Sequence, residues 1–169
     1  MCTIWRSKVA SNQSGATILE FALVAIIVLS LLFAIVDLSL MLFANLAMQH
    51  AVRSGARYAV TGREDIDPGG RRLAVIKKIE DSSIGLCKKN HCTVAFYRLN
   101  PDGSVSSIPA DPDNPKSSDV GTPNEIIVVA VENYSWTLLT PLIRPFFPDG
   151  KYTFTVKATM RNEPFPTGG

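Results

Sequence analysis

The sequence predicts an α+β protein in which a long N-terminal helix carries a small antiparallel β-sheet on its distal half. The first observation behind this prediction is the low charge: of 169 residues, 46% are hydrophobic and only 19% are charged, against the ~25% usual for soluble domains. The second is that residues 16–47 contain only Glu20 and Asp37 as ionisable side chains. The third is an alternation of apolar and polar residues near the C-terminus, which is typical of strands.

The balance of charge excludes some classes of protein. The chain has 17 Lys and Arg residues against 15 Asp and Glu residues. A strongly basic nucleic-acid-binding protein is therefore disfavoured, and we expect no nucleic-acid partner. The high apolar content argues against a generally disordered chain.

The first part of the predicted helix is long and apolar enough to cross a membrane. Residues 21–36 contain one polar side chain, Ser30, and residues 16–19 extend the run to the ~20 residues that a transmembrane helix needs. Because hydrocarbon admits only helices and closed barrels, the sequence predicts one span at about residues 16–36. A buried core helix is the alternative, although an apolar run of roughly 10–14 residues is typical of that class.

The helical pattern continues beyond the span. Four apolar residues recur at helical spacing: Leu38, Leu42, Leu46 and Ala47. No glycine or proline follows them before Gly55. We expect one helix over residues 16–60, on the order of 65 Å long. Its distal half lies outside the membrane, so its apolar stripe needs a protein partner, and we expect the sheet to cover it.

Asp37 marks the far end of the predicted span. It lies ~25 Å along the helix from Glu20, close to the opposite face of a ~30 Å hydrocarbon layer. We interpret it as an interfacial carboxylate where the helix leaves the membrane. A salt bridge to an assembly partner is the alternative.

The segment before the span contains a cleavage motif. Basic residues Arg6 and Lys8 precede Gly15, which is followed by four residues and then Glu20-Phe21. This resembles the processing site of type IV pilins and pseudopilins of the tight-adherence (Tad/Flp) branch, where an aspartic prepilin peptidase cuts on the cytoplasmic side. Glycine suits the site because it lets the backbone enter a protease without side-chain obstruction. The resemblance implies a leader of residues 1–15, removed between Gly15 and Ala16.

Glu20 is the residue that the pilin resemblance singles out. A carboxylate in an apolar run is costly, and such charges usually mark function. In pilins, this glutamate pairs with the terminal amine of a neighbouring subunit. The resemblance therefore implies that Glu20, with Phe21 beside it, sets the stagger of helices during assembly. The plainer interpretation places Glu20 in the headgroup region.

The end of the helix carries a second motif. Residues 51–59 read AVRSGARYA, and together with the start of the span they are similar to the TadE-like family of small pseudopilins. Arg53 and Arg57 share one helix face near a C-terminus, where the dipole favours cations, and Gly55 permits close approach of another backbone. We expect a helix-end contact at these three residues and Tyr58. A solvated helix terminus is the alternative.

The cysteines indicate in which compartment the domain after the span lies. The numbers of Lys and Arg residues on the two sides of the span do not settle its orientation. Cys2 falls in the leader, which leaves Cys87 and Cys92. Such a pair fits a disulfide in an oxidising compartment. A metal site with His91 is the alternative, but three clustered ligands are too few for a closed zinc site. We therefore expect a cytoplasmic N-terminus and a periplasmic or extracellular domain.

Residues 61–169 are predicted to form this exported α+β domain. We expect an amphipathic helix over residues 71–84 that buries Leu73, Ile76 and Ile79. Residues 140–150 are predicted to be a loop in which Phe146 and Phe147 pack back on the sheet or form an exposed contact. We expect a strand over residues 93–99 and an exposed loop over residues 100–124. Residues 125–132 are predicted to form a central strand, which residues 134–140 extend or neighbour. Residues 151–160 are predicted to form an antiparallel strand.

No catalytic motif is present: the sequence has no P-loop, dinucleotide glycine motif, HExxH pair or G-x-S-x-G elbow. We expect no enzyme, cofactor or metal. The resemblance implies a minor pseudopilin of a Tad pilus in the bacterial inner membrane, with lipid, the prepilin peptidase, other pilin subunits and the assembly platform as partners. A single-pass protein with an exported binding domain outside any fibre is the second hypothesis. An exported hydrolase is a remote third.

Overall fold

The computed structural model describes residues 13–88, 91–109, 120–141 and 143–165. The long helix α1 (Gln13–Val60) is followed by α2 (Arg71–Ser82) and by four strands, with two short 3-10 turns, η1 (Arg144–Phe146) and η2 (Pro148–Gly150), before the last strand. The α+β class predicted from the sequence is confirmed. The predicted leader lies almost entirely outside the described residues, as does most of the second half of the predicted loop 100–124.

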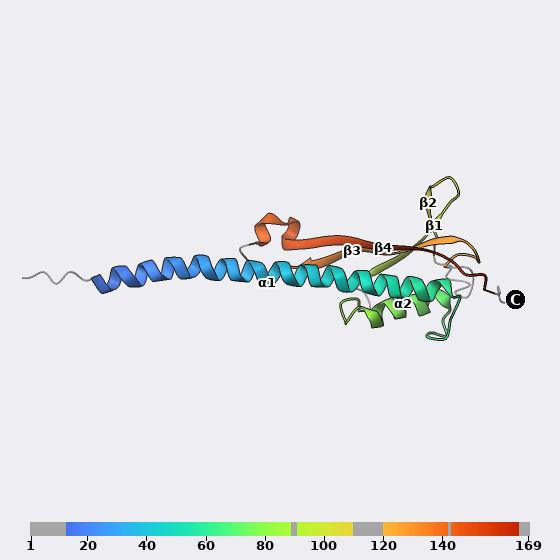
Figure 1. Ribbon diagram of the computed structural model, residues 1–169, viewed down its shortest axis with the longest axis horizontal. Coiled ribbons are helices and arrows are strands. Elements are labelled where there is room, and N and C mark those ends of the chain that lie inside the picture. Colours follow the sequence, from blue (N-terminus) through green and yellow to red (C-terminus); the bar gives the residue numbers. More distant parts are fainter. Residues whose placement is uncertain (1–12, 89–90, 110–119, 142, 166–169) are drawn as a thin grey trace, which may run out of the picture.

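Helix α1 is a single rod that extends far beyond the rest of the molecule (Figure 1). Its 48 residues correspond to about 72 Å at 1.5 Å per residue. It is long and apolar enough to cross a membrane, and its most apolar stretch is covered by no other part of the described protein. The predicted continuous helix is therefore confirmed.

The sheet is antiparallel, with the strand order β2-β1-β3-β4. The strands are β1 (Thr93–Leu99), β2 (Val105–Ser107), β3 (Ile126–Thr137) and β4 (Lys151–Arg161). The central strand β3 continues through Thr137, so the predicted segment 134–140 extends the strand in part and does not form a neighbouring one. A register shift lies between Val131 and Tyr134, where Asn133 has a φ of 50°. Such a bulge bends a strand without ending it.

The predicted loop 100–124 was wrong in one part, because β2 pairs with β1 inside it as a short hairpin. All three residues of β2 are exposed. A strand without a buried face has no alternation of apolar and polar residues, so periodicity could not find it.

The face of α1 that packs on the domain differs from the predicted one. Helix α1 packs against β3 and β4 on one side and against α2 on another (Figure 1). Of the predicted stripe, Ala47 is buried, but the three leucines remain 49% to 64% exposed: Leu38, Leu42 and Leu46. The buried face consists mostly of small residues: Ala44, Ala47, Met48, Ala51, Val52, Ala56 and Ala59. Small side chains let the sheet and α2 approach the helix axis closely, which leucines would prevent.

Helix α2 forms where the sequence predicts it, and its predicted buried face is confirmed in part. Ile79 is fully buried and Ile76 is partly buried against the core, but Leu73 is exposed and Val75 is buried in its place. The close fit at Ile79 depends on α1, because a Cβ built on Gly55 would be 2.3 Å from Ile79 Cγ1. Ile79 occupies the space that the missing side chain leaves. The close backbone approach expected at Gly55 therefore occurs within the chain.

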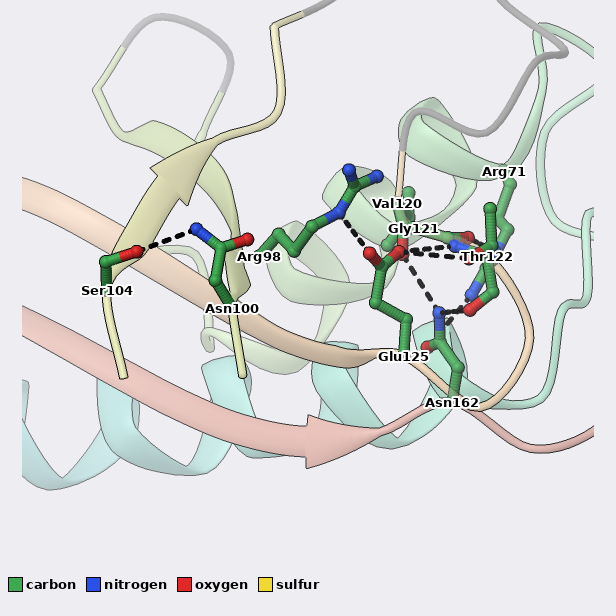
Figure 2. A network of polar contacts seen from close by, with 9 residues as sticks. All are labelled: Arg71, Arg98, Asn100, Ser104, Val120, Gly121, Thr122, Glu125 and Asn162. Carbon is green, nitrogen blue, oxygen red and sulfur yellow. Dashed lines mark hydrogen bonds and ion pairs between the residues drawn. The ribbon is translucent and has the colours of Figure 1, made fainter. Parts of the chain in front are cut away.

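A buried arginine joins the ends of the elements (Figure 2). Arg71 donates hydrogen bonds to the carbonyls of Ala59 and Gly121 and to the Asn162 side chain, at 3.0, 2.9 and 3.2 Å. Burial lowers the pKa of Arg71 to about 10, so the side chain is still cationic at neutral pH. These bonds fix the end of α1 and the start of α2 to the end of β4, and hence hold the domain on the helix.

Candidate assembly surface

The N-terminal turns of α1 carry the residues expected to act in processing and pairing. Gly15, Ala16, Glu20 and Phe21 are all helical and exposed, and Phe21 has 73% of its surface accessible. A Cβ on Gly15 would have no atom within 4 Å. Packing within the chain therefore does not require a glycine here, unlike at Gly55.

Asp37 has a role that neither interpretation of the sequence foresaw. Its side chain is only 1% exposed, and its carboxylate accepts hydrogen bonds from the backbone N–H groups of Leu139 and Thr140 at 3.0 and 2.7 Å. The Thr140 hydroxyl donates to the Phe33 carbonyl at 3.5 Å. The carboxylate thus forms a clasp within the chain, which fixes the loop after β3 on α1 and leaves it buried rather than free for the salt bridge that was the alternative. Its position where the helix leaves the membrane stays a prediction.

The helix-end motif divides into inward and outward residues. Gly55 is buried against α2, and the Tyr58 hydroxyl donates to Asp65 at 2.8 Å, which lowers the pKa of the Asp65 carboxyl. Arg53 and Arg57 point outward and are exposed. Tyr58 is half-buried, so the two arginines are the most exposed residues of the predicted contact.

Arg53 and Arg57 line a groove of about 520 Å³ between α1, α2 and β4. Three further basic side chains line it, and none of its described lining residues is a carboxylate: His50, Arg63 and Lys78. The exposed face of α1 thus changes along its length from apolar at Leu38, Leu42 and Leu46 to basic at the distal end.

The structure joins Cys87 to Cys92 as a disulfide, with the Cα atoms 5.4 Å apart. Cys87 is buried beneath the sheet core, and its backbone N–H is bound by the Ser83 hydroxyl at 3.0 Å. His91 is exposed. Within the described ranges, no three His, Cys, Asp or Glu side chains gather as metal ligands would.

A comparison with known families bears on the long helix. The model of the TadE-like protein family matches residues 15–57. Over this segment the chain is similar to that family. The match begins at Gly15 and ends at Arg57, so it includes the predicted processing and pairing residues and most of the helix-end motif. It confirms the resemblance seen in the sequence.

The TadE-like match covers about a quarter of the chain and lies entirely within α1. It suggests a protein associated with a Tad pilus, and the one long apolar helix fits a single-pass membrane protein of such a system. No curated protein and no solved structure matches the chain. No comparison therefore bears on the domain that follows the helix, and its role is argued from its structure alone.

Proposed function

We propose that this protein is a TadE-like minor pseudopilin, which a prepilin peptidase trims and which acts in the assembly of a Tad pilus or as one of its components in surface adhesion. The observation that carries the proposal is the exposed leucine face of α1. Leu38, Leu42 and Leu46 lie beyond the length needed to cross a bilayer, beside the folded domain, and yet the domain leaves them uncovered.

An exposed face of this kind favours a neighbouring subunit. Burying a leucine side chain contributes about 1.5–3 kcal/mol, and Phe43 adds a further exposed apolar side chain. Contiguous apolar patches of this kind mark interaction sites in soluble regions of proteins. Helices of neighbouring subunits, packed side by side, would cover this face.

The glycine at position 15 supports processing. A glycine inside a helix costs about 0.5–1 kcal/mol relative to alanine, and Gly15 makes no close approach that would require it. Recognition by a peptidase gives a reason for it. Cleavage there leaves an amine on Ala16, one helical turn from Glu20, and the Glu20 carboxylate of one subunit would pair with the amine of the next.

The same proposal sets the topology. The N-terminus lies on the cytoplasmic side, where the peptidase acts, and residues 61–169 lie in the periplasm or outside the cell. The Cys87–Cys92 disulfide supports this, because disulfides persist in oxidising compartments. Arg53 and Arg57 then offer a basic contact to an assembly partner at the distal end of the helix.

Intact-mass measurement of the protein purified from membranes tests the processing step. In cells with an active prepilin peptidase, we expect the mass of residues 16–169, and in cells without it the mass of the full chain. A full-length mass in both strains would contradict the proposal and favour the second hypothesis, a simple membrane anchor with an exported binding domain.

The pairing step is tested with Glu20→Ala. We expect normal membrane insertion and normal processing, but fewer subunits in sheared filaments or fewer filaments. Glu163→Ala, which removes an exposed carboxylate at the other end of the chain, is the matched control. Normal filament number and composition in Glu20→Ala would show that the pairing role is wrong.

A further inference from the structure

We propose that the segment between β3 and β4, described at residues 138–141 and 143–150, rests on the outer surface of the membrane and inserts Leu139 and Phe146 among the lipids. This inference depends on the proposed membrane span of α1. In Figure 1 the segment, with η1 and η2, lies over α1 nearer to its N-terminal half than any other described part of the domain. It is the part of the domain that faces the membrane.

The contacts of this segment with α1 fix its height. It is held to the helix at Phe33 and Asp37, through the bonds from Thr140 and Leu139. Counted from Ala16, these positions are about 26 and 32 Å along the helix. The hydrocarbon core of a bilayer is about 30 Å thick. The segment therefore sits where α1 leaves the hydrocarbon.

The side chains of the segment suit that position. Phe146 is 83% exposed, the highest value for any large hydrophobic side chain in the described ranges, and Leu139 is 64% exposed. Phe147, which follows Phe146, packs edge-on against Tyr152, with ring centroids 6.3 Å apart. One phenylalanine is thus anchored in the domain while the other is presented outward. The sequence left these two possibilities open for both residues.

Two hydrogen bonds hold the backbone that presents Phe146. The N–H of Phe146 donates to the carbonyl of Ile143 at 3.0 Å, and the Arg144 guanidinium donates to the carbonyl of Leu138 at 2.9 Å. A side chain held in this way can enter lipid without the loss of backbone hydrogen bonds, which hydrocarbon penalises. Phenylalanine and leucine are typical of the apolar face of interfacial segments.

The charges nearby are compatible with lipid headgroups. Arg144, Asp149 and Lys151 are the exposed charged residues of the segment and its border with β4, and their sum is one positive charge. The Asp37 carboxylate beneath them is buried and engaged by two N–H groups. The segment is also bonded to α1 at the carbonyl of Phe33, whose side chain is half exposed on the proposed span, and this position favours lipid over a protein partner.

Quenching by brominated lipid tests the inference. The full chain, with Trp5 and Trp136 replaced by Phe, is reconstituted into phosphatidylcholine–phosphatidylglycerol vesicles whose acyl chains carry bromine near the headgroup. With Phe146→Trp as the sole tryptophan, we expect these lipids to reduce the emission by about twofold, as for an interfacial side chain. With Val105→Trp, an exposed position on β2 far from the segment, we expect no quenching.

A third reporter separates this inference from the proposed span. Ile26→Trp lies in the middle of that span, and its quenching by lipid brominated near the end of the acyl chain reports insertion of α1. Quenching at Ile26→Trp without quenching at Phe146→Trp would overturn the inference alone, and the absence of both would overturn the span as well. A blue shift of Phe146→Trp that depends on protein density, without quenching, would show that a second copy covers the segment, and it would also overturn the inference.

Discussion

The two faces of α1 beside the domain differ in the size of their apolar side chains and in their burial. The face toward the domain is formed mainly by alanines, together with Met48 and Val52, and is buried. The opposite face carries Leu38, Leu42 and Leu46 and is exposed. Small side chains bring the helix backbone close to the sheet and α2. The large ones remain outside, where they can bury more apolar area against another molecule.

One helix can therefore pack against two partners, the domain of its own chain on one face and a neighbouring subunit on the other. Within the chain, the domain uses the alanine face, so the fold does not need the leucine face. If the proposed function is right, the leucine face is needed only when subunits assemble. The same substitution should therefore lower the free energy of unfolding on the alanine face and lower incorporation into filaments on the leucine face.

The largest expected effect is that of a charge on the buried face. Ala51 is fully buried, so Ala51→Asp would place an unpaired carboxylate in the core and lower the free energy of unfolding by more than about 3 kcal/mol. Chemical denaturation of the full chain in detergent, followed by tyrosine and tryptophan fluorescence, measures this.

Leu46→Asp is the matched change on the exposed face. We expect the free energy of unfolding to stay within about 0.5 kcal/mol of the wild-type value, while incorporation into sheared filaments falls strongly. If both variants were equally destabilised, the two faces would not differ in the way proposed here.

The two glycines of α1 provide the next test. Gly55→Val would bring its side chain against Ile79, and we expect a loss of about 1–3 kcal/mol in unfolding free energy from overpacking. Shortening the neighbour in the double variant Gly55→Val/Ile79→Ala should recover part of this loss. Gly15→Val is the control, because its side chain would meet open space. We expect Gly15→Val to leave stability unchanged and to block processing.

The clasp at Asp37 comes next in size. Asp37→Ala would leave the N–H groups of Leu139 and Thr140 without their acceptor, at a cost of about 1–3 kcal/mol. Hydrogen exchange of the full chain should show faster exchange at these two amides and unchanged exchange in the centre of β3. Asp37→Asn, which retains one carbonyl acceptor, should have a smaller effect. Equal exchange in the wild type and Asp37→Ala would contradict the clasp.

Local patterns predicted the elements well. The apolar run gave the continuous helix, and the alternation in residues 151–160 gave β4. The Gly15 to Phe21 motif and the helix-end motif predicted the TadE-like match. Each of these signals depends only on residues close to one another in the sequence.

The errors concern contacts between distant residues. Asp37 and Leu139 are separated by 102 positions, and nothing near Asp37 announces a backbone partner. The covered face of α1 was misjudged because the helix is apolar on nearly all sides, so that periodicity does not distinguish the face that packs from the face that remains exposed. The buried Arg71 could not be predicted for the same reason, because its hydrogen-bond acceptors come from three separate segments of the chain.

The smallest effect on stability is expected where α1 changes from apolar to basic. Arg53 and Arg57 are exposed, so Arg53→Glu/Arg57→Glu should change the free energy of unfolding by no more than about 0.5 kcal/mol. If the groove that they line meets an acidic surface of an assembly partner, reversing two charges should still reduce incorporation into filaments. Lys77→Glu/Lys88→Glu, which reverses two exposed charges outside the groove, serves as the control. Equal incorporation of both double variants would show that the distal end of the helix is merely solvated, and would restrict the assembly contacts to the leucine face and the N-terminal turns.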